Sequence, residues 1–215
     1  MPIIHKHIEN ELTRLKAGEL IFASDFRTAG TGGAIKMALS RLNKEGKIKR
    51  LAHGIYIKPK TDPLFGFIYP SPETIAETIA EKEKLKITPA GPYALHRLGL
   101  STQVPTQFTY LTNGTPRQIR VGKAIIKFKT TNPKRLERVG KISSLVIQAL
   151  EELDIKKIDA DTAYKLKALL LQEDPAKLNH DLKITTTRVS DFIFTLLKGT
   201  YDDRLVTTNK RTKKD

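Results

Sequence analysis

The sequence contains no cysteine among its 215 residues. That absence excludes disulfide bonds, catalytic thiolates, zinc ribbons and iron–sulfur clusters. It also lacks any run of about 18 apolar residues, the length that a membrane-spanning helix needs. The N-terminal segment is charged and amphipathic, without the apolar core of roughly 7–15 residues that marks a secretory signal. We therefore expect a cytoplasmic protein that does not contact a membrane.

Catalytic signatures are missing as well. The sequence has no P-loop, no GxSxG and no HExxH. His5 and Glu9 share a face of the first predicted helix, but two ligands do not make a metal site. Asp159 and Asp161 are interpreted as helix caps, and the acidic-x-Lys pattern at residues 154–156 falls at a helix end rather than in a strand. We expect no enzyme activity, no cofactor and no metal.

Positive charge is what the sequence has in excess. Lys and Arg number 38 against 23 Asp and Glu, which gives a formal net charge of +15. Residues 1–60 carry 12 basic and 5 acidic residues, so this first part of the chain holds nearly half of the excess. A field of this sign favours association with nucleic acid or anionic surfaces, although it says nothing about fold.

The first half of this basic segment predicts two helices around a short strand. Apolar residues recur at helical spacing from Ile4 to Leu15, and Gly18 ends that helix. Residues 20–22 form a strand-like apolar run. Residues 23–26 predict the start of a second short helix, with Ser24 or Asp25 as its cap.

The second half predicts a further helix and a hairpin. A glycine-rich turn at residues 27–33 ends with Thr31 as the cap of a helix over residues 34–45. Four apolar residues of this helix fall within one arc of about 100°: Ile35, Ala38, Leu39 and Leu42. Residues 47–51 and 55–58 predict two strands, joined by a tight turn at residues 52–54.

This order of elements is that of a winged helix-turn-helix, whose third helix enters the major groove of DNA. Side chains on the solvent face of the helix would reach the bases, and those of the hairpin would lie along the flanking phosphate backbone or the minor groove. The predicted DNA-binding residues are Thr31, Lys36, Ser40, Arg41 and Lys44 of the helix, and Lys47, Lys49, Arg50 and His53 of the hairpin, with Lys58 at its end.

Two segments resemble a known family. The stretch ALSRLNKEGKIKRLAHGIYIKP, residues 38–59, resembles the N-terminal winged helix of AbiEi-type antitoxins of bacterial abortive-infection systems. The segment ALHRLGLSTQVP, residues 94–105, followed by a strand, is similar to a helix that comes after the DNA-binding domain in that family. The resemblance implies a repressor that binds promoter repeats of its own operon and counteracts a nucleotidyltransferase-like toxin. It also implies Lys36, Ser40, Arg41 and Lys44 as DNA-reading residues, with Arg50 and His53 in the wing.

The rest of the chain predicts a mixed region and then helices. Prolines mark residues 59–71 as a linker, and Ser71-Pro72 is a helix start whose apolar side runs on to Leu85. A short helix over residues 93–98 precedes strands at residues 107–111, 118–121 and 124–129. Helical spacing then begins at Leu136 and runs through residue 153. Further helices are predicted over residues 161–172, from Asp174-Pro175 onward, and over residues 189–197.

The sequence thus predicts an α+β protein with a winged helix-turn-helix at residues 1–61. An interaction or antitoxin domain at residues 62–202 combines a mixed α/β segment with a helical bundle. A basic tail at residues 203–215 is expected to be disordered.

We expect a DNA-binding repressor that acts as the antitoxin of a type IV toxin–antitoxin pair, with double-stranded DNA and a toxin as partners. The alternatives are a winged-helix protein-interaction module, a general regulator without a toxin, and a nucleic-acid-processing enzyme.

Overall fold

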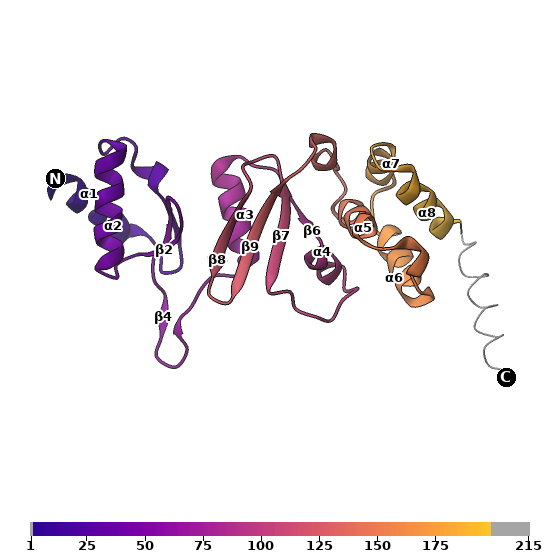
Figure 1. The fold of residues 1–215 in the computed structure, drawn as a ribbon, viewed down its shortest axis with the longest axis horizontal. Coiled ribbons are helices and arrows are strands. Elements are labelled where there is room, and N and C mark those ends of the chain that lie inside the picture. The colour runs from indigo at the N-terminus through magenta and orange to yellow at the C-terminus, as the bar shows by residue number, and fades with distance from the viewer. Residues whose placement is uncertain (1, 199–215) are drawn as a thin grey trace. The chain divides into compact units, whose positions relative to one another are not determined.

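The computed structural model describes residues 2–198 and has an α+β fold (Figure 1). Within this described range the chain forms two compact units, residues 2–84 with 118–126, and residues 85–117 with 127–198. The predicted domain boundary between residues 61 and 62 concerns which parts of the chain fold independently, and it stays a prediction. The predicted tail at residues 203–215 lies outside the described residues.

The first unit begins with helix α1 (Pro2–Arg14), whose apolar face packs against α2. Ile8 and Leu12 are buried, as their spacing predicts. The last carbonyls of this helix have no partner within it, and the Lys58 ammonium supplies one from the end of the hairpin. Its Nζ donates to the carbonyl oxygens of Leu12 at 2.8 Å and Leu15 at 2.7 Å.

Helix α2 (Gly32–Lys44) begins at the predicted cap. The Thr31 hydroxyl accepts a hydrogen bond from the backbone N–H of Ala34 at 3.4 Å. The apolar stripe is buried as predicted, with Leu39 and Leu42 fully inaccessible to solvent. It belongs to one core that also contains Ile8, Ile21 and other buried residues of the first unit.

A three-stranded antiparallel sheet completes this core. Its strands β1 (Leu20–Phe22), β2 (Lys49–Ala52) and β3 (Ile55–Ile57) lie in the order β1-β3-β2. All three were predicted. Between β1 and α2 the predicted short helix is a single 3-10 turn, η1 (Ala23–Phe26).

The predicted cap of η1 is wrong. Its N-cap is Phe22, so neither Ser24 nor Asp25 occupies the first position. Asp25 is three residues further on, and its carboxylate accepts a hydrogen bond from the Phe22 N–H at 3.0 Å. An acidic side chain at this third position satisfies the donor at the start of the turn from inside it.

The segment predicted as a linker contains a second hairpin, of strands β4 (Thr61–Asp62) and β5 (Gly66–Phe67). The Asp62 carboxylate accepts hydrogen bonds from the N–H groups of Leu64 and Phe65, at 2.8 and 3.1 Å. Proline after Asp62 is favoured at the second position of a turn. Pro63, one of the prolines that indicated a linker, therefore belongs to an ordered hairpin.

Helix α3 (Pro72–Glu83) begins as predicted, with Ser71 as cap and Pro72 in the first turn. Ile75 and Ile79 are buried. The helix ends at Lys84, which adopts a left-handed conformation with φ 55°. Leu85 therefore does not extend the helical stripe, contrary to the prediction.

A four-stranded sheet has the order β6-β7-β9-β8. Strands β7 (Gln107–Thr112), β8 (Arg117–Val121) and β9 (Ala124–Thr130) agree with the prediction. Strand β6 (Ile87–Ala90), which pairs with β7, was missed because its sequence ITPA contains a proline. Helix α4 (Pro92–Arg97) was predicted.

The helical part has one core, made by α5 (Lys141–Glu152), α6 (Ala160–Leu170), α7 (Pro175–Lys183) and α8 (Thr187–Leu197). Two short 3-10 turns, η2 (Pro133–Leu136) and η3 (Ile155–Lys157), precede and follow α5. The cap expected at Asp159 is confirmed, because its carboxylate accepts a hydrogen bond from the Thr162 N–H. The cap expected at Asp161 is wrong, because Asp161 lies inside the first turn of α6 and pairs with Lys165. Asp174 caps α7, where its carboxylate accepts a hydrogen bond from the Ala176 N–H.

The prediction of one helical run from Leu136 is wrong, because α5 begins only at Lys141. Two carboxylates accept hydrogen bonds from backbone N–H groups just before α5 and in its first turn. Asp181, fully buried, accepts from the N–H groups of Val139 and Gly140 at 2.8 and 3.1 Å. Glu173 accepts from those of Ile142 and Ser143 at 2.7 and 3.0 Å. Burial raises the pKa of Glu173, but these hydrogen bonds lower it more, so that the pKa lies below the ordinary value.

Gly140 has no room for a side chain at this junction. A Cβ built there would lie 2.0 Å from Ser143 Oγ and 2.6 Å from Glu173 Oε2. We expect Gly140→Ala to lower the free energy of unfolding by about 2 kcal/mol or more, because it displaces the carboxylate that binds the helix start. Urea denaturation followed by circular dichroism measures this.

The matched control is Gly33→Ala in the first turn of α2, where a Cβ would meet nothing within 4 Å. Alanine favours the helix there, so this variant should be about 0.5–1 kcal/mol more stable than the wild type. Equal stability of the two variants would contradict the role given to Gly140.

Candidate nucleic-acid interface

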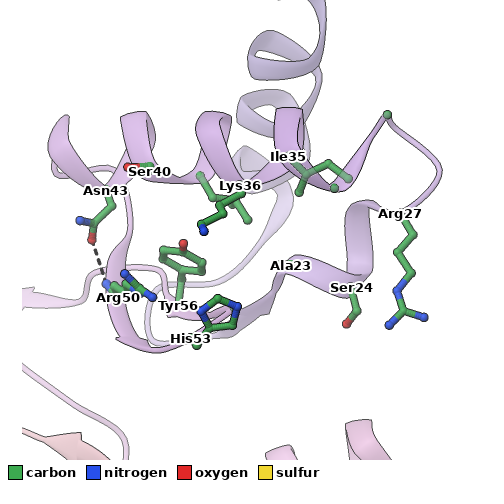
Figure 2. Close-up of a pocket in the computed structure, with 14 residues that line it drawn as sticks. Ala23, Ser24, Arg27, Ile35, Lys36, Ser40, Asn43, Arg50, His53 and Tyr56 are labelled. Carbon is green, nitrogen blue, oxygen red and sulfur yellow. Dashed lines mark hydrogen bonds between the residues drawn. The ribbon is translucent and has the colours of Figure 1, made fainter.

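A concave surface of about 410 Å³ lies between α2, η1 and the β2–β3 hairpin (Figure 2). We call it the α2 groove. Its lining residues are Ala23, Ser24, Arg27, Gly30, Gly32, Ile35, Lys36, Leu39, Ser40, Asn43, Arg50, His53, Gly54 and Tyr56. Within this lining set there is no carboxylate, and it contains two arginines, a lysine and a histidine. The groove is therefore a cationic and polar surface.

Four of the predicted DNA-binding residues meet in the α2 groove. Lys36 and Ser40 come from the solvent face of α2, and Arg50 and His53 come from the hairpin. Figure 2 shows Lys36 reaching from the helix toward the hairpin. All four are exposed. The structure thus brings together side chains from two elements that the sequence assigned to one surface.

Two groove residues were missed by the sequence analysis, Arg27 and Asn43. Asn43 follows Lys36 by seven residues, which at about 100° per residue places it within about 20° of Lys36 around the helix. This spacing could have revealed it. Arg27 lies just after η1, in the turn, where no periodicity marks its direction.

Asn43 joins the two sides of the groove. Its Oδ1 accepts a hydrogen bond from the backbone N–H of Arg50 at 2.9 Å, which is the dashed line in Figure 2. The Arg50 Nε in turn donates to the carbonyl oxygen of Ala52 at 3.2 Å. The first bond ties the start of the hairpin to α2, and the second, within β2, orients the Arg50 side chain at the groove.

Arg41 and Lys44 lie on α2 but outside the α2 groove. At about 100° per residue, Arg41 is about 140° from Lys36 around the helix. It lines a separate small depression with Ile4 and Met37. Arg41 and Lys44 are both exposed, so contact with DNA stays a prediction for each, but not as part of the surface that Lys36 forms.

Thr31 and Lys47 both have partners within the protein. The Thr31 oxygen caps α2, as described above, and its hydroxyl is exposed at the helix start. Lys47 pairs with Glu9 and, at 3.0 Å, with Glu45. These hydrogen bonds raise the pKa of Lys47, and the bond from Lys47 lowers the pKa of Glu9. The charge of Lys47 is therefore compensated.

Lys49 and Lys58 also have local roles. The Lys49 ammonium lies 4.4 Å from the ring centroid of Phe67 and 5.1 Å from that of Tyr69, in the range of a cation–π contact. Lys58 binds the end of α1, as described above. Of the predicted basic hairpin residues, Arg50 and His53 are thus the two that line the groove.

Among residues 2–198, no cluster of three or more histidine or carboxylate side chains could hold a metal ion. In the same described range, no helix is both long enough and apolar enough to cross a membrane.

In a comparison with protein-family models, a family model matches residues 7–178. The matching family is described as a family of unknown function, DUF6088. A comparison with curated proteins gives no match.

Removing the Asn43 side-chain oxygen should loosen the hairpin. We expect Asn43→Ala to lower the free energy of unfolding by about 1 kcal/mol, because the N–H of Arg50 loses its partner in the protein. Ser40→Ala, one turn earlier on the same exposed face, is the matched control and should change stability by less than about 0.5 kcal/mol. Chemical denaturation measures both, and an equal loss in the two variants would argue against the Asn43 link.

Proposed function

Because the chain belongs to the DUF6088 family, whose function is unknown, we propose a function from its own groove: it binds double-stranded DNA as a transcriptional regulator. The observation that carries the proposal is the α2 groove, in which cationic side chains of a helix and a hairpin gather without a carboxylate. The helix–strand–turn–helix–hairpin order of residues 2–57 supports a winged helix-turn-helix, in which these two elements contact the duplex.

In this proposal α2 lies in the major groove. Lys36 is long enough to reach the acceptors on a guanine edge. Ser40 can donate or accept at a neighbouring base, and the Asn43 amide nitrogen can donate while its oxygen accepts from Arg50. Arg50 and His53, on the hairpin, and Arg27, at the other end of the α2 groove, contact phosphates. The phosphate contacts supply affinity and register, and the α2 side chains supply the choice of sequence.

We further propose that the protein is the antitoxin of a type IV toxin–antitoxin pair. This step rests on the resemblance of residues 38–59 and 94–105 to AbiEi-type antitoxins. The helical part has a core of its own and leaves apolar side chains exposed: Tyr164, Leu171 and Phe194 are 66%, 68% and 46% accessible. A surface of this kind suits a protein partner better than DNA.

DNA binding is tested with the duplex that lies upstream of the protein's own gene. We expect Lys36→Ala and Arg50→Ala each to weaken binding by about tenfold, since each removes a cation from the groove. The control Lys156→Ala removes an exposed charge from η3 and should bind like the wild type. Gel retardation at several salt concentrations measures this.

The same series also separates base reading from phosphate binding. Lys36→Ala should reduce the preference for the upstream duplex over a shuffled one, whereas Arg50→Ala should weaken both equally. No retardation of any duplex at low salt would reject the DNA-binding function and would favour a protein-interaction module.

The antitoxin role has a separate test. If the adjacent reading frame resembles a nucleotidyltransferase, its expression alone should arrest growth, and co-expression of this chain should restore it. The Lys36→Ala variant should still restore growth when expressed from a foreign promoter, because the proposed antitoxic part is the C-terminal one. Growth arrest that persists with the wild-type chain would reject the antitoxin role while leaving DNA binding intact.

A further inference from the structure

The β4–β5 hairpin holds two large apolar side chains in solvent. Leu64 is 88% accessible and Phe65 is 80% accessible. Isolated exposed apolar residues are common on protein surfaces. Two adjacent ones at the tip of a narrow hairpin are a different case, because the hairpin projects them beyond the surrounding polar residues.

The exposure is fixed by the local structure. Asp62 accepts hydrogen bonds from the N–H groups of both tip residues, as described above, and Gly66 closes the turn with φ 69°, a conformation that glycine adopts at low cost. Beyond the strands, the Ile68 N–H donates to the carbonyl oxygen of Lys60 at 2.7 Å. The backbone of the tip is therefore held in a defined turn, from which both side chains extend into solvent.

The base of this hairpin is attached to the wing. Phe67 and Tyr69 pack edge to face, with ring centroids 4.4 Å apart, and the Lys49 ammonium lies over both rings. Lys49 precedes Arg50 in β2, and Arg50 lines the α2 groove. The β4–β5 hairpin is thus anchored to Lys49, the residue next to Arg50 of the candidate DNA surface.

The segments that flank this hairpin in sequence are basic, although Lys47 is paired with Glu9 and Glu45 and Lys58 binds the end of α1. Between Gly46 and Pro70 the chain has five lysines and arginines and a single acidic residue, Asp62. The Asp62 carboxylate is occupied by the two N–H groups of the turn. A polyanion can therefore approach this hairpin without meeting a free carboxylate. An acidic or apolar protein surface would have to extend well beyond the tip to cover the hairpin.

The area of the tip also argues against a protein partner. Large apolar or aromatic side chains bury roughly 150–250 Å² each, whereas a stable protein interface needs about 800 Å² from each partner. Two side chains alone fall well short of that area. They do match the apolar wedges, phenylalanine or leucine, that proteins insert between base pairs from the minor groove.

We propose that the β4–β5 hairpin is a second DNA-binding element, whose Leu64–Phe65 tip inserts between base pairs from the minor groove and kinks the duplex. This inference rests on the proposed DNA-binding function and adds a deformation of the DNA to it. The wedge would make affinity depend on how easily a base step unstacks, and flexible pyrimidine–purine steps would be preferred at that point.

The test uses the absence of tryptophan from the full chain. Phe65→Trp places a single tryptophan at the tip, and Val104→Trp, at an exposed position between α4 and β7, is its control. On addition of a mixed-sequence duplex of about 30 base pairs at low salt, stacking on bases should reduce the tryptophan emission of F65W at least about twofold. The tryptophan emission of V104W should stay unchanged.

A second measurement uses the double variant Leu64→Ala/Phe65→Ala, whose exposed positions leave the core intact. It should bind the same duplex about tenfold more weakly. Energy transfer between dyes at the two duplex ends should report a bend with the wild type and a straighter duplex with the double variant.

The outcomes separate the wedge from the general function. If F65W binds the duplex without a change in emission, and the double variant binds and bends it like the wild type, the wedge is overturned and the DNA-binding function stands. If F65W emission depends on protein concentration without DNA, the tip is covered by a second copy and the wedge is overturned. If the wild type binds no duplex, both proposals fail.

Discussion

The burial of one stripe of α2 is the constraint on which the candidate interface depends. Four apolar residues at helical spacing, from Ile35 to Leu42, enter the core that α1 and the three-stranded sheet share. Once this stripe is inside, the position of every other side chain around the helix is fixed. Lys36, Ser40 and Asn43 must then face outward together, on the side where the wing lies. The hydrophobic effect therefore orients a polar surface.

The polar links then fix the elements around that helix. Thr31 defines where α2 begins. At the other end of α2, Asn43 binds the β2–β3 hairpin, and Lys58 joins the end of that hairpin to α1. Each link satisfies backbone groups that would otherwise lack a partner in the protein. None of them is a large energetic term, but together they hold the helix and hairpin in one relative position.

Much of the fold could be predicted because its signals are local. Helical spacing and the caps at Ser71 and Asp159 depend on neighbours in the sequence. The failures involve partners distant in sequence or competing signals. The start of α5 depends on Glu173 and Asp181, more than thirty residues away, and the β4–β5 hairpin was hidden by prolines that also mark linkers.

The candidate site was predictable in part for the same reason. The solvent face of α2 follows from the positions of its buried residues, which is why Lys36 and Ser40 were found. The prediction placed every basic residue opposite the core on one surface, and this was too broad. The angle of each residue around α2, at about 100° per residue, separates Arg41 from Lys36 and places Asn43 beside Lys36. Arg27 could not be found, because a residue in an irregular turn has no period that predicts its direction.

The ion pairs of Lys47 and the buried role of Lys58 change how the charge of the first sixty residues should be counted. A formal count treats each lysine as able to displace one condensed cation from a polyanion, about 0.9 of a counterion per phosphate neutralised. The charge of Lys47 is already balanced by Glu9 and Glu45, and the Lys58 ammonium donates hydrogen bonds to backbone carbonyl groups. The number of counterions released on association should therefore follow the groove cations rather than the composition of the segment.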